Sequence, residues 1–255
     1  DIHGYRISQL FSSKIDPGEI LNEYRTTRFP DRFYNLKIGI PWADLERRLD
    51  ESAVLSLCTD YVMGRDCDRA YRFMGVDTGK NLHVVIMATH NDLKSPMVIH
   101  LEACHEFHDL DRLMEQFNVK LCVIDGLPET HATREFTQRN RGKVYMNFFL
   151  ESQRGKANWD RKGLMVRVNR TEALDASRKA IREKEVLLPR RTPQIEEFAK
   201  HLAADAKVLD EDEETGIKKY RYIRTGVNHY SLAFTYAWLA KSKMVPAGTY
   251  GYLRI

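Results

Sequence analysis

Two aspartates occupy equivalent positions in the sequence, because each one ends a run of apolar residues. Asp77 follows Phe73-Met-Gly-Val76, and Asp125 follows Leu121-Cys-Val-Ile124. A charged side chain at the end of a buried strand is unstable unless it is paired or binds a cation. If both strands end at one edge of a sheet, the two carboxylates lie side by side and repel each other unless a cation lies between them. The sequence therefore predicts a metal site.

Hydrolysis of a phosphodiester is a reaction that such a pair of carboxylates supports. Two divalent ions, Mg²⁺ or Mn²⁺, bridged by a carboxylate lower the pKa of an attacking water and stabilise the departing oxygen. The site needs a further ligand, and the candidate is His229, in the first turn of the last expected helix. Packing in the core and capping of that helix are the alternative roles of His229.

Two weaker candidates complete the ligand set. Asn228 is a good helix N-cap and a weak oxygen ligand. Glu102, near the end of the third expected strand, is either a further ligand or a surface glutamate. The remaining histidines, His83 among them, form no HxxxH or HExxH pattern, so no role is assigned to them. One imidazole beside oxygen ligands favours Mn²⁺ over Mg²⁺.

The elements that must position these residues follow from apolar patterns and turn residues. Three strands with short turns predict an antiparallel meander, and a helix, a parallel strand, a second helix and another strand come after it. The expected ranges are, in order, 71–77, 82–89, 97–103, 108–117, 120–125, 128–139 and 144–150. This is the order of an α/β protein with an RNase H-like mixed sheet, antiparallel then parallel, flanked by helices.

The remaining segments are less regular. Residues 1–70 are expected to be a lead-in, with short helices at 20–24 and 42–49, that packs on a main domain of residues 71–255. Past the fifth strand, the sequence predicts an exposed loop, a short strand, two helices, a hairpin with an acidic tip and a last helix. Their ranges are 151–163, 164–168, 171–184, 192–204, 206–224 and 228–241.

The composition fits a chain with a full-sized core and a polyanionic partner. The chain has 255 residues, 43% of them hydrophobic, no apolar run long enough to cross a membrane, and a net charge of +4. Residues 134–191 hold 16 Lys and Arg against 7 Asp and Glu, so we expect this basic region to bind DNA phosphates. Solvated helix faces are the alternative. The expected contacts are Arg134, Arg139, Arg141, Lys218, Lys219 and Arg221.

Four cysteines show no CxxC spacing, so buried free thiols are expected. These are Cys58, Cys67, Cys104 and Cys122. An irregular zinc site formed by the first three with His108 is the alternative.

Three motifs together resemble a known family. They are Gly75-Val-Asp77-Thr-Gly79, Val123-Ile-Asp125 and the stretch from Gly226-Val-Asn228-His229 to Tyr236-Ala. In this order they are similar to the nuclease domain of the large terminase subunit of tailed double-stranded DNA bacteriophages. Residues 170–175 and 193–198 add to the likeness, which covers residues 71–240.

The resemblance implies a metal-dependent endonuclease that cuts concatemeric DNA during genome packaging in the host cytoplasm. Its implied partners are double-stranded DNA, a packaging ATPase domain, the portal and the small terminase subunit, with no membrane. The family's first two catalytic acids fall on Asp77 and Asp125. Its last motif usually carries acids where this chain has Asn228 and Leu232, which leaves His229 as the third ligand. No GxxxxGK[ST] loop is present, so this chain corresponds to the nuclease half alone.

Two other functions remain open. The departures at Asn228 and Leu232 fit a DNA-gripping module of a packaging motor that has lost its metal site. An ATPase of the acetate- and sugar-kinase type also begins with an Asp-x-Gly turn after a strand, but it needs a second Gly-rich turn, which the second half of this chain lacks.

Overall fold

The computed structural model describes most of the chain, and the chain divides into two compact units. The described residues are 8–26, 33–39, 49–64, 68–69, 71–90, 94–128, 130–211 and 218–244. One unit comprises residues 1–48 and 206–223, and the other comprises residues 49–205 and 224–255. The boundary that the sequence predicts at residue 70 stays a prediction. In the described part of the chain, no helix is long and apolar enough to span a bilayer.

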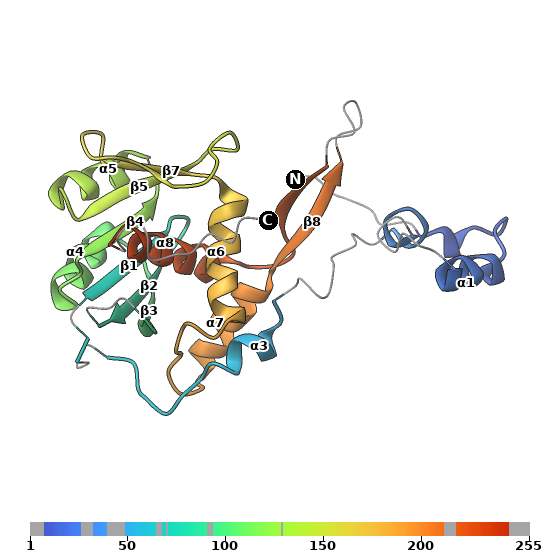
Figure 1. Cartoon of the computed structure of the whole chain (residues 1–255), viewed down its shortest axis with the longest axis horizontal. Coiled ribbons are helices and arrows are strands. Elements are labelled where there is room, and N and C mark those ends of the chain that lie inside the picture. Colours follow the sequence, from blue (N-terminus) through green and yellow to red (C-terminus); the bar gives the residue numbers. More distant parts are fainter. Residues whose placement is uncertain are drawn as a thin grey trace. The chain divides into compact units, whose positions relative to one another are not determined.

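The second unit is built on a mixed seven-stranded sheet (Figure 1). Its spatial order is β3-β2-β1-β4-β5-β7-β6. The strands are β1 (Tyr71–Asp77), β2 (Leu82–Thr89), β3 (Met97–Cys104), β4 (Leu121–Asp125), β5 (Val144–Phe149), β6 (Asn158–Asp160) and β7 (Met165–Val168). The first three strands are antiparallel, whereas β4, β5 and β7 run parallel to β1. This confirms the predicted RNase H-like fold. The predicted loop at 151–163 is wrong at Asn158–Asp160, because these residues pair with β7 as an edge strand.

Helices cover both faces of this sheet. The helices of this unit are α3 (Glu51–Leu55), α4 (Phe107–Gln116), α5 (Thr130–Arg139), α6 (Arg170–Arg182), α7 (Pro193–Ala203) and α8 (His229–Met244). Side chains of α4 and α5 pack on one face with alternate residues of β1, β2, β4 and β5. Side chains of α7 and α8 pack on the other face. The expected helices and strands of this region are confirmed to within a few residues.

Helix α8 is the element that brings the last motif to the sheet (Figure 1, red). It is apolar around almost its whole circumference, because it lies between the sheet and helices α6 and α7. It approaches β1 so closely that a Cβ added to Gly75 would lie 2.0 Å from the carbonyl oxygen of Ala233. Only glycine fits there, so Gly75 sets the distance between α8 and the strand that ends in Asp77.

The other unit holds short helices and a hairpin. Its described elements are η1 (Gln9–Phe11), α1 (Pro17–Thr26), η2 (Phe33–Ile38), β8 (Asp205–Glu211) and β9 (Lys218–Arg224). Of the two strands, the residues Asp205 and Arg224 are assigned to the second unit. Strands β8 and β9 pair with each other as a two-stranded sheet. Helix α1 and the hairpin confirm the predictions at 20–24 and 206–224. The predicted helix at 42–49 and the acidic hairpin tip lie outside the described residues.

Candidate metal centre

The sheet register places Asp77 beside Asp125. Gly75 pairs with Val123 and Val76 with Ile124, so each aspartate is the next residue on its own parallel strand. Paired residues of neighbouring strands point to the same face, and adjacent strands lie about 5 Å apart. Both carboxylates therefore lie at the carboxyl edge of the central strands, on the face that α8 covers. The charge of Asp77 also contributes to raising the pKa of Asp125, which is consistent with this closeness.

Hydrogen bonds hold the carboxylate of Asp125 in place. The phenol of Tyr236 donates to its Oδ2 over 2.8 Å, and the backbone N–H of Leu127 donates to its Oδ1 over 3.3 Å. The pKa of Asp125 is raised to about 6, and burial is the largest cause of this rise. A carboxyl group that is desolvated and placed beside another one gains most from a bound cation, because the cation removes both penalties.

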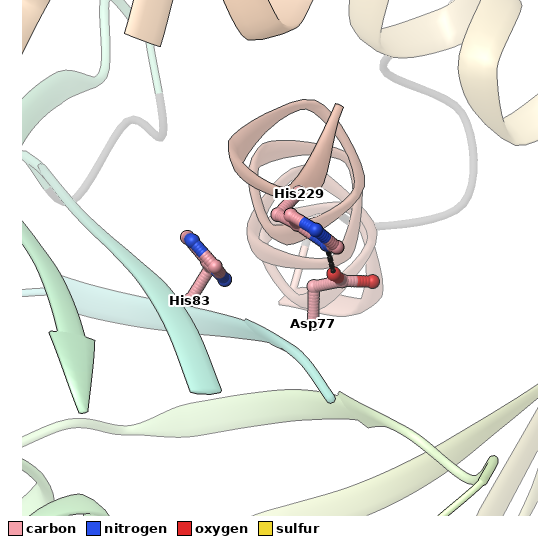
Figure 2. Close-up of side chains that lie close together, drawn as sticks. All are labelled: Asp77, His83 and His229. Carbon is pink, nitrogen blue, oxygen red and sulfur yellow. Dashed lines mark hydrogen bonds and ion pairs between the residues drawn. The ribbon is translucent and has the colours of Figure 1, made fainter. Parts of the chain in front are cut away.

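Asp77 contacts His229, which starts helix α8 (Figure 2). The Nδ1 atom of His229 lies 2.8 Å from Oδ2 of Asp77, and the aspartate is only 3% exposed. Burial raises the pKa of Asp77, while the hydrogen bond and charge of His229 oppose that rise. Of the three residues for which the sequence predicts catalytic and metal-binding roles, the structure brings Asp77 and His229 into contact, and the sheet register places Asp125 next to Asp77. Those roles stay predictions.

His83 is a residue that the sequence analysis missed. It pairs with Asp77 across the β1–β2 hairpin, and its ring stacks on that of His229 with centroids 4.5 Å apart. Burial lowers the pKa of His83 to about 4, and the charges of His229 and His201 add to this effect. The imidazole of His83 is therefore neutral at pH 7 and able to bind a metal. Asp77, His83 and His229 each offer one ligand atom, and these atoms lie within 4.8 Å of one another (Figure 2).

A buried ion pair fixes the start of α8. Arg178 of α6 donates to Oδ2 of Asp205 over 2.7 Å, and both side chains are almost fully buried. Ser231 of α8 hydrogen-bonds to both of these residues. The side-chain amide of Asn228 donates to the other oxygen of Asp205 over 2.7 Å. Asn228 therefore anchors the helix that carries His229, and its amide group is engaged with Asp205 instead of with Asp77.

A second buried amide lies beside Asp125. Asn147 of β5 is paired in register with Asp125 and is 0% exposed. Tyr145, two residues earlier, packs with α8, so strand alternation places Asn147 on the same face as the carboxylates. Neither polar atom of its side chain has a hydrogen-bond partner among the described residues. A buried amide of this kind costs about 1–3 kcal/mol, which is consistent with a role in binding water or an ion.

Glu102 is not brought to this edge of the sheet. Glu102 pairs with His100 and Arg112 and lies in register with Val84, whose side chain is on the α4 face. Of the basic residues, Arg134, Arg141 and Lys219 are exposed, whereas Arg139 is paired with Asp111 and Arg221 with Asp210. Lys218 lies in β9. Cys104 and Cys122 are buried free thiols, as expected, whereas Cys58 is a free thiol that is only partly buried, and Cys67 of the alternative zinc site lies outside the described residues.

The donor atoms at the edge of the sheet fit a divalent ion. Two carboxylates on neighbouring strands supply the hard oxygen ligands that Mg²⁺ and Mn²⁺ prefer, and the imidazoles supply the nitrogen ligands of softer ions. Partial burial and the second-layer hydrogen bonds from Tyr236 and Leu127 fix the orientation of Asp125 before an ion binds.

Solved structures similar to this chain are known. Among them are large terminases and the nuclease domains of large terminases. The large terminase nuclease from thermophilic phage G20c has 13% identity, covers 75% of this chain and 97% of its own, and superposes with a TM-score of 0.47. The nuclease domain of the large terminase of bacteriophage SPP1, solved with bound Mn, also has 13% identity, covers 71% and 93%, and has a TM-score of 0.42.

The large terminase of another thermophilic bacteriophage is similar over 90% of this chain but only 53% of its own, with 11% identity and a TM-score of 0.44. These structures come from the family that the sequence motifs resemble. No protein-family model and no curated protein sequence matches this chain.

Proposed function

We propose that this chain is a divalent-metal-dependent DNA endonuclease of a viral genome-packaging terminase. The observation that carries the proposal is the placement of Asp77 and Asp125 at adjacent positions of the two central parallel strands. A pair of desolvated carboxylates at one sheet edge is costly without a cation. A role in binding a divalent cation explains why the chain keeps this unfavourable pair.

In this proposal, some residues bind the metal and others orient the metal ligands. Asp77 and Asp125 hold the metal, with His229 as a further ligand or as the group that orients Asp77. Tyr236 orients Asp125 through its hydroxyl. Two divalent ions at this place would supply an attacking water of lowered pKa and charge compensation at the departing 3′ oxygen. No base-reading motif is evident, so we propose cleavage with little sequence specificity.

The partners follow from the same proposal. Exposed basic residues, Arg134, Arg141 and Lys219 among them, would contact the phosphates of double-stranded DNA. A packaging ATPase domain, the portal and the small terminase subunit would be the protein partners, in the cytoplasm of the host.

Cleavage of supercoiled plasmid in Mg²⁺ or Mn²⁺ tests the proposal. The parent protein should nick and linearise the plasmid, and Asp77→Asn and Asp125→Asn should each lower the rate about a hundredfold or more, because metal assistance contributes several kcal/mol. His229→Ala should lower it strongly, whereas His131→Ala, at an exposed site, serves as the control.

A gel-shift assay separates the nuclease from a module that only holds DNA. A parent protein that shifts DNA but leaves plasmid intact with both ions would be the non-catalytic module. Either aspartate variant cutting at the parental rate would show that the wrong acids had been chosen.

A further inference from the structure

We propose that His83, Asp77 and His229 form a metal site of their own, with two imidazoles and one carboxylate, that selects Zn²⁺, Co²⁺ or Mn²⁺ over Mg²⁺. The inference rests on the proposed function in that Asp77 and His229, to which that proposal gives roles in metal binding, also serve this site. The side of the Asp77 carboxylate that faces His83 and His229 binds the softer ion. The side that faces Asp125 binds an ion that prefers oxygen ligands.

The first observation is the convergence of three ligand atoms. Asp77 ends β1, His83 begins the neighbouring strand β2, and His229 begins α8, so three separate elements supply them (Figure 2). The three ligand atoms lie within 4.8 Å of one another. Two ligand atoms bound at about 2.1 Å to one ion lie about 3.4 Å apart in a tetrahedral site. To close the site, the rings of His83 and His229, which stack with centroids 4.5 Å apart, must turn out of their parallel arrangement, and the hydrogen bond between His229 and Asp77 opens as they do so.

The second observation concerns a buried nitrogen of His83. Nδ1 of His83 is buried and has no partner of ordinary hydrogen-bond geometry among the described residues, while the contact of the His83 ring with the backbone of Asn81 only partly opposes the lowering of its pKa. An unsatisfied buried nitrogen is unfavourable in a folded protein. The nearby His201 differs, because its Nδ1 accepts the backbone N–H of Tyr230. A role as metal ligand accounts for the open nitrogen of His83, and it distinguishes His83 from His201.

The chemistry of the donors sets the class of ion. Mg²⁺ prefers an all-oxygen octahedral environment and binds imidazole weakly, whereas Zn²⁺, Co²⁺ and Mn²⁺ accept mixed nitrogen and oxygen ligands. The opposite side of Asp77 faces Asp125 and offers no imidazole in the described residues. The two sides of one carboxylate thus differ in the ion that each prefers.

Metal binding to the whole chain tests the inference without reference to activity. Zn²⁺ and Co²⁺ are titrated by calorimetry, and Co²⁺ is also followed by its visible absorption, in the parent, in His83→Gln and in His131→Gln. His131 is a matched control because its side chain is 90% exposed. We expect His83→Gln to weaken binding of both ions at least about a hundredfold, since losing even an outer partner of a ligand costs 10–100-fold. His131→Gln should match the parent.

X-ray absorption on the zinc-loaded parent gives an answer that does not depend on a variant folding. Two imidazole ligands per ion are expected, and one or none would overturn the inference. Parental affinity of His83→Gln for both ions would overturn it as well. A parent that fails to cut DNA in any ion, yet binds Zn²⁺ through His83, would refute the nuclease and support the metal site.

Discussion

The Cα of Gly75 lies directly against the backbone of Ala233, at the point where the central strand meets the last helix. A Cβ built on Gly75 would lie 2.0 Å from the carbonyl oxygen of Ala233 and 2.2 Å from the backbone nitrogen of Ala237. Backbone atoms cannot move aside as a flexible side chain can. The methyl group of alanine at this position must therefore push α8 away from β1, and with it His229 and Tyr236.

Gly75→Ala is predicted to destabilise the protein and to abolish cleavage. Overpacking of a core costs about 1–3 kcal/mol and sometimes more, and a clash with helix backbone belongs at the upper end. Urea unfolding measures the loss. Gly79→Ala is the control, because the nearest atom to its added Cβ is 3.7 Å away. Equal midpoints for the two variants would contradict the close approach of α8.

Removal of the Asp125 charge is predicted to alter how stability depends on pH in the absence of metal. The pKa of Asp125 is raised to about 6 from the ordinary value of 3.8, so the folded state holds its proton more tightly than the unfolded state. The free energy of unfolding contributed by this group therefore falls as the pH rises from about 4 to about 6 and stays low above that.

Asp125→Asn keeps an acceptor for Tyr236 but has no proton to lose. In EDTA, the stability of this variant relative to the parent should rise across pH 4 to 6 and then level off. Denaturant unfolding at half-unit steps of pH measures the difference. A constant difference across this window would mean that Asp125 is not desolvated in the folded protein.

Divalent ions are predicted to stabilise the parent protein against unfolding. An ion that binds only the folded state adds about 2.7 kcal/mol at a concentration of 100 Kd. Thermal unfolding with and without Mn²⁺ should therefore show a higher midpoint, which EDTA reverses. Asp77→Asn should lose most of this shift, because the carboxylate serves both sides of the site. An equal shift in parent and variant would place the ion elsewhere.

Asn147→Val is predicted to raise stability and to lower cleavage. The buried amide of Asn147 has no partner among the described residues, so its removal should stabilise the protein by about 1–2 kcal/mol. Cleavage should fall because a polar group beside Asp125 is lost. Asn140→Val is the contrasting variant. The amide of Asn140 donates to Asp111 and to the carbonyl of Phe136, so its loss should destabilise the protein. Urea unfolding and plasmid nicking measure both effects; a destabilised Asn147→Val that cuts at the parental rate would contradict the prediction.

The fold could be predicted from sequence where apolar patterns and turn residues agree. The meander from β1 to β3 and the parallel strand β4 carry both signals, so their ranges and the aspartates at their ends were predicted within a residue or two. Strand β6 could not be predicted, because Asn158–Asp160 is short and partly polar and is a strand only through its pairing with β7. Such pairing is a tertiary effect that the local sequence does not encode.

Some residues of the candidate site could be predicted from the sequence, and others could not. Asp77, Asp125 and His229 stand in motifs, and their proximity was predicted from the order of the elements. His83 has no motif, and the signal that could have identified it is the register of a hairpin with a four-residue turn, which places it opposite Asp77. Asn147 lies within an apolar strand, and only the structure shows that its amide is enclosed without a partner.

The bond between Asp77 and His229 joins residues 152 positions apart in the chain. Synthesis on the ribosome therefore completes the sheet edge long before the helix that closes it exists. A nascent chain that has not reached residue 236 holds both aspartates but lacks the phenol that orients Asp125, and a shorter one also lacks the imidazole of His229. Under the proposed function, the ability to cut nucleic acid would arise only at the final docking of α8, which protects the cell from incomplete copies of the protein.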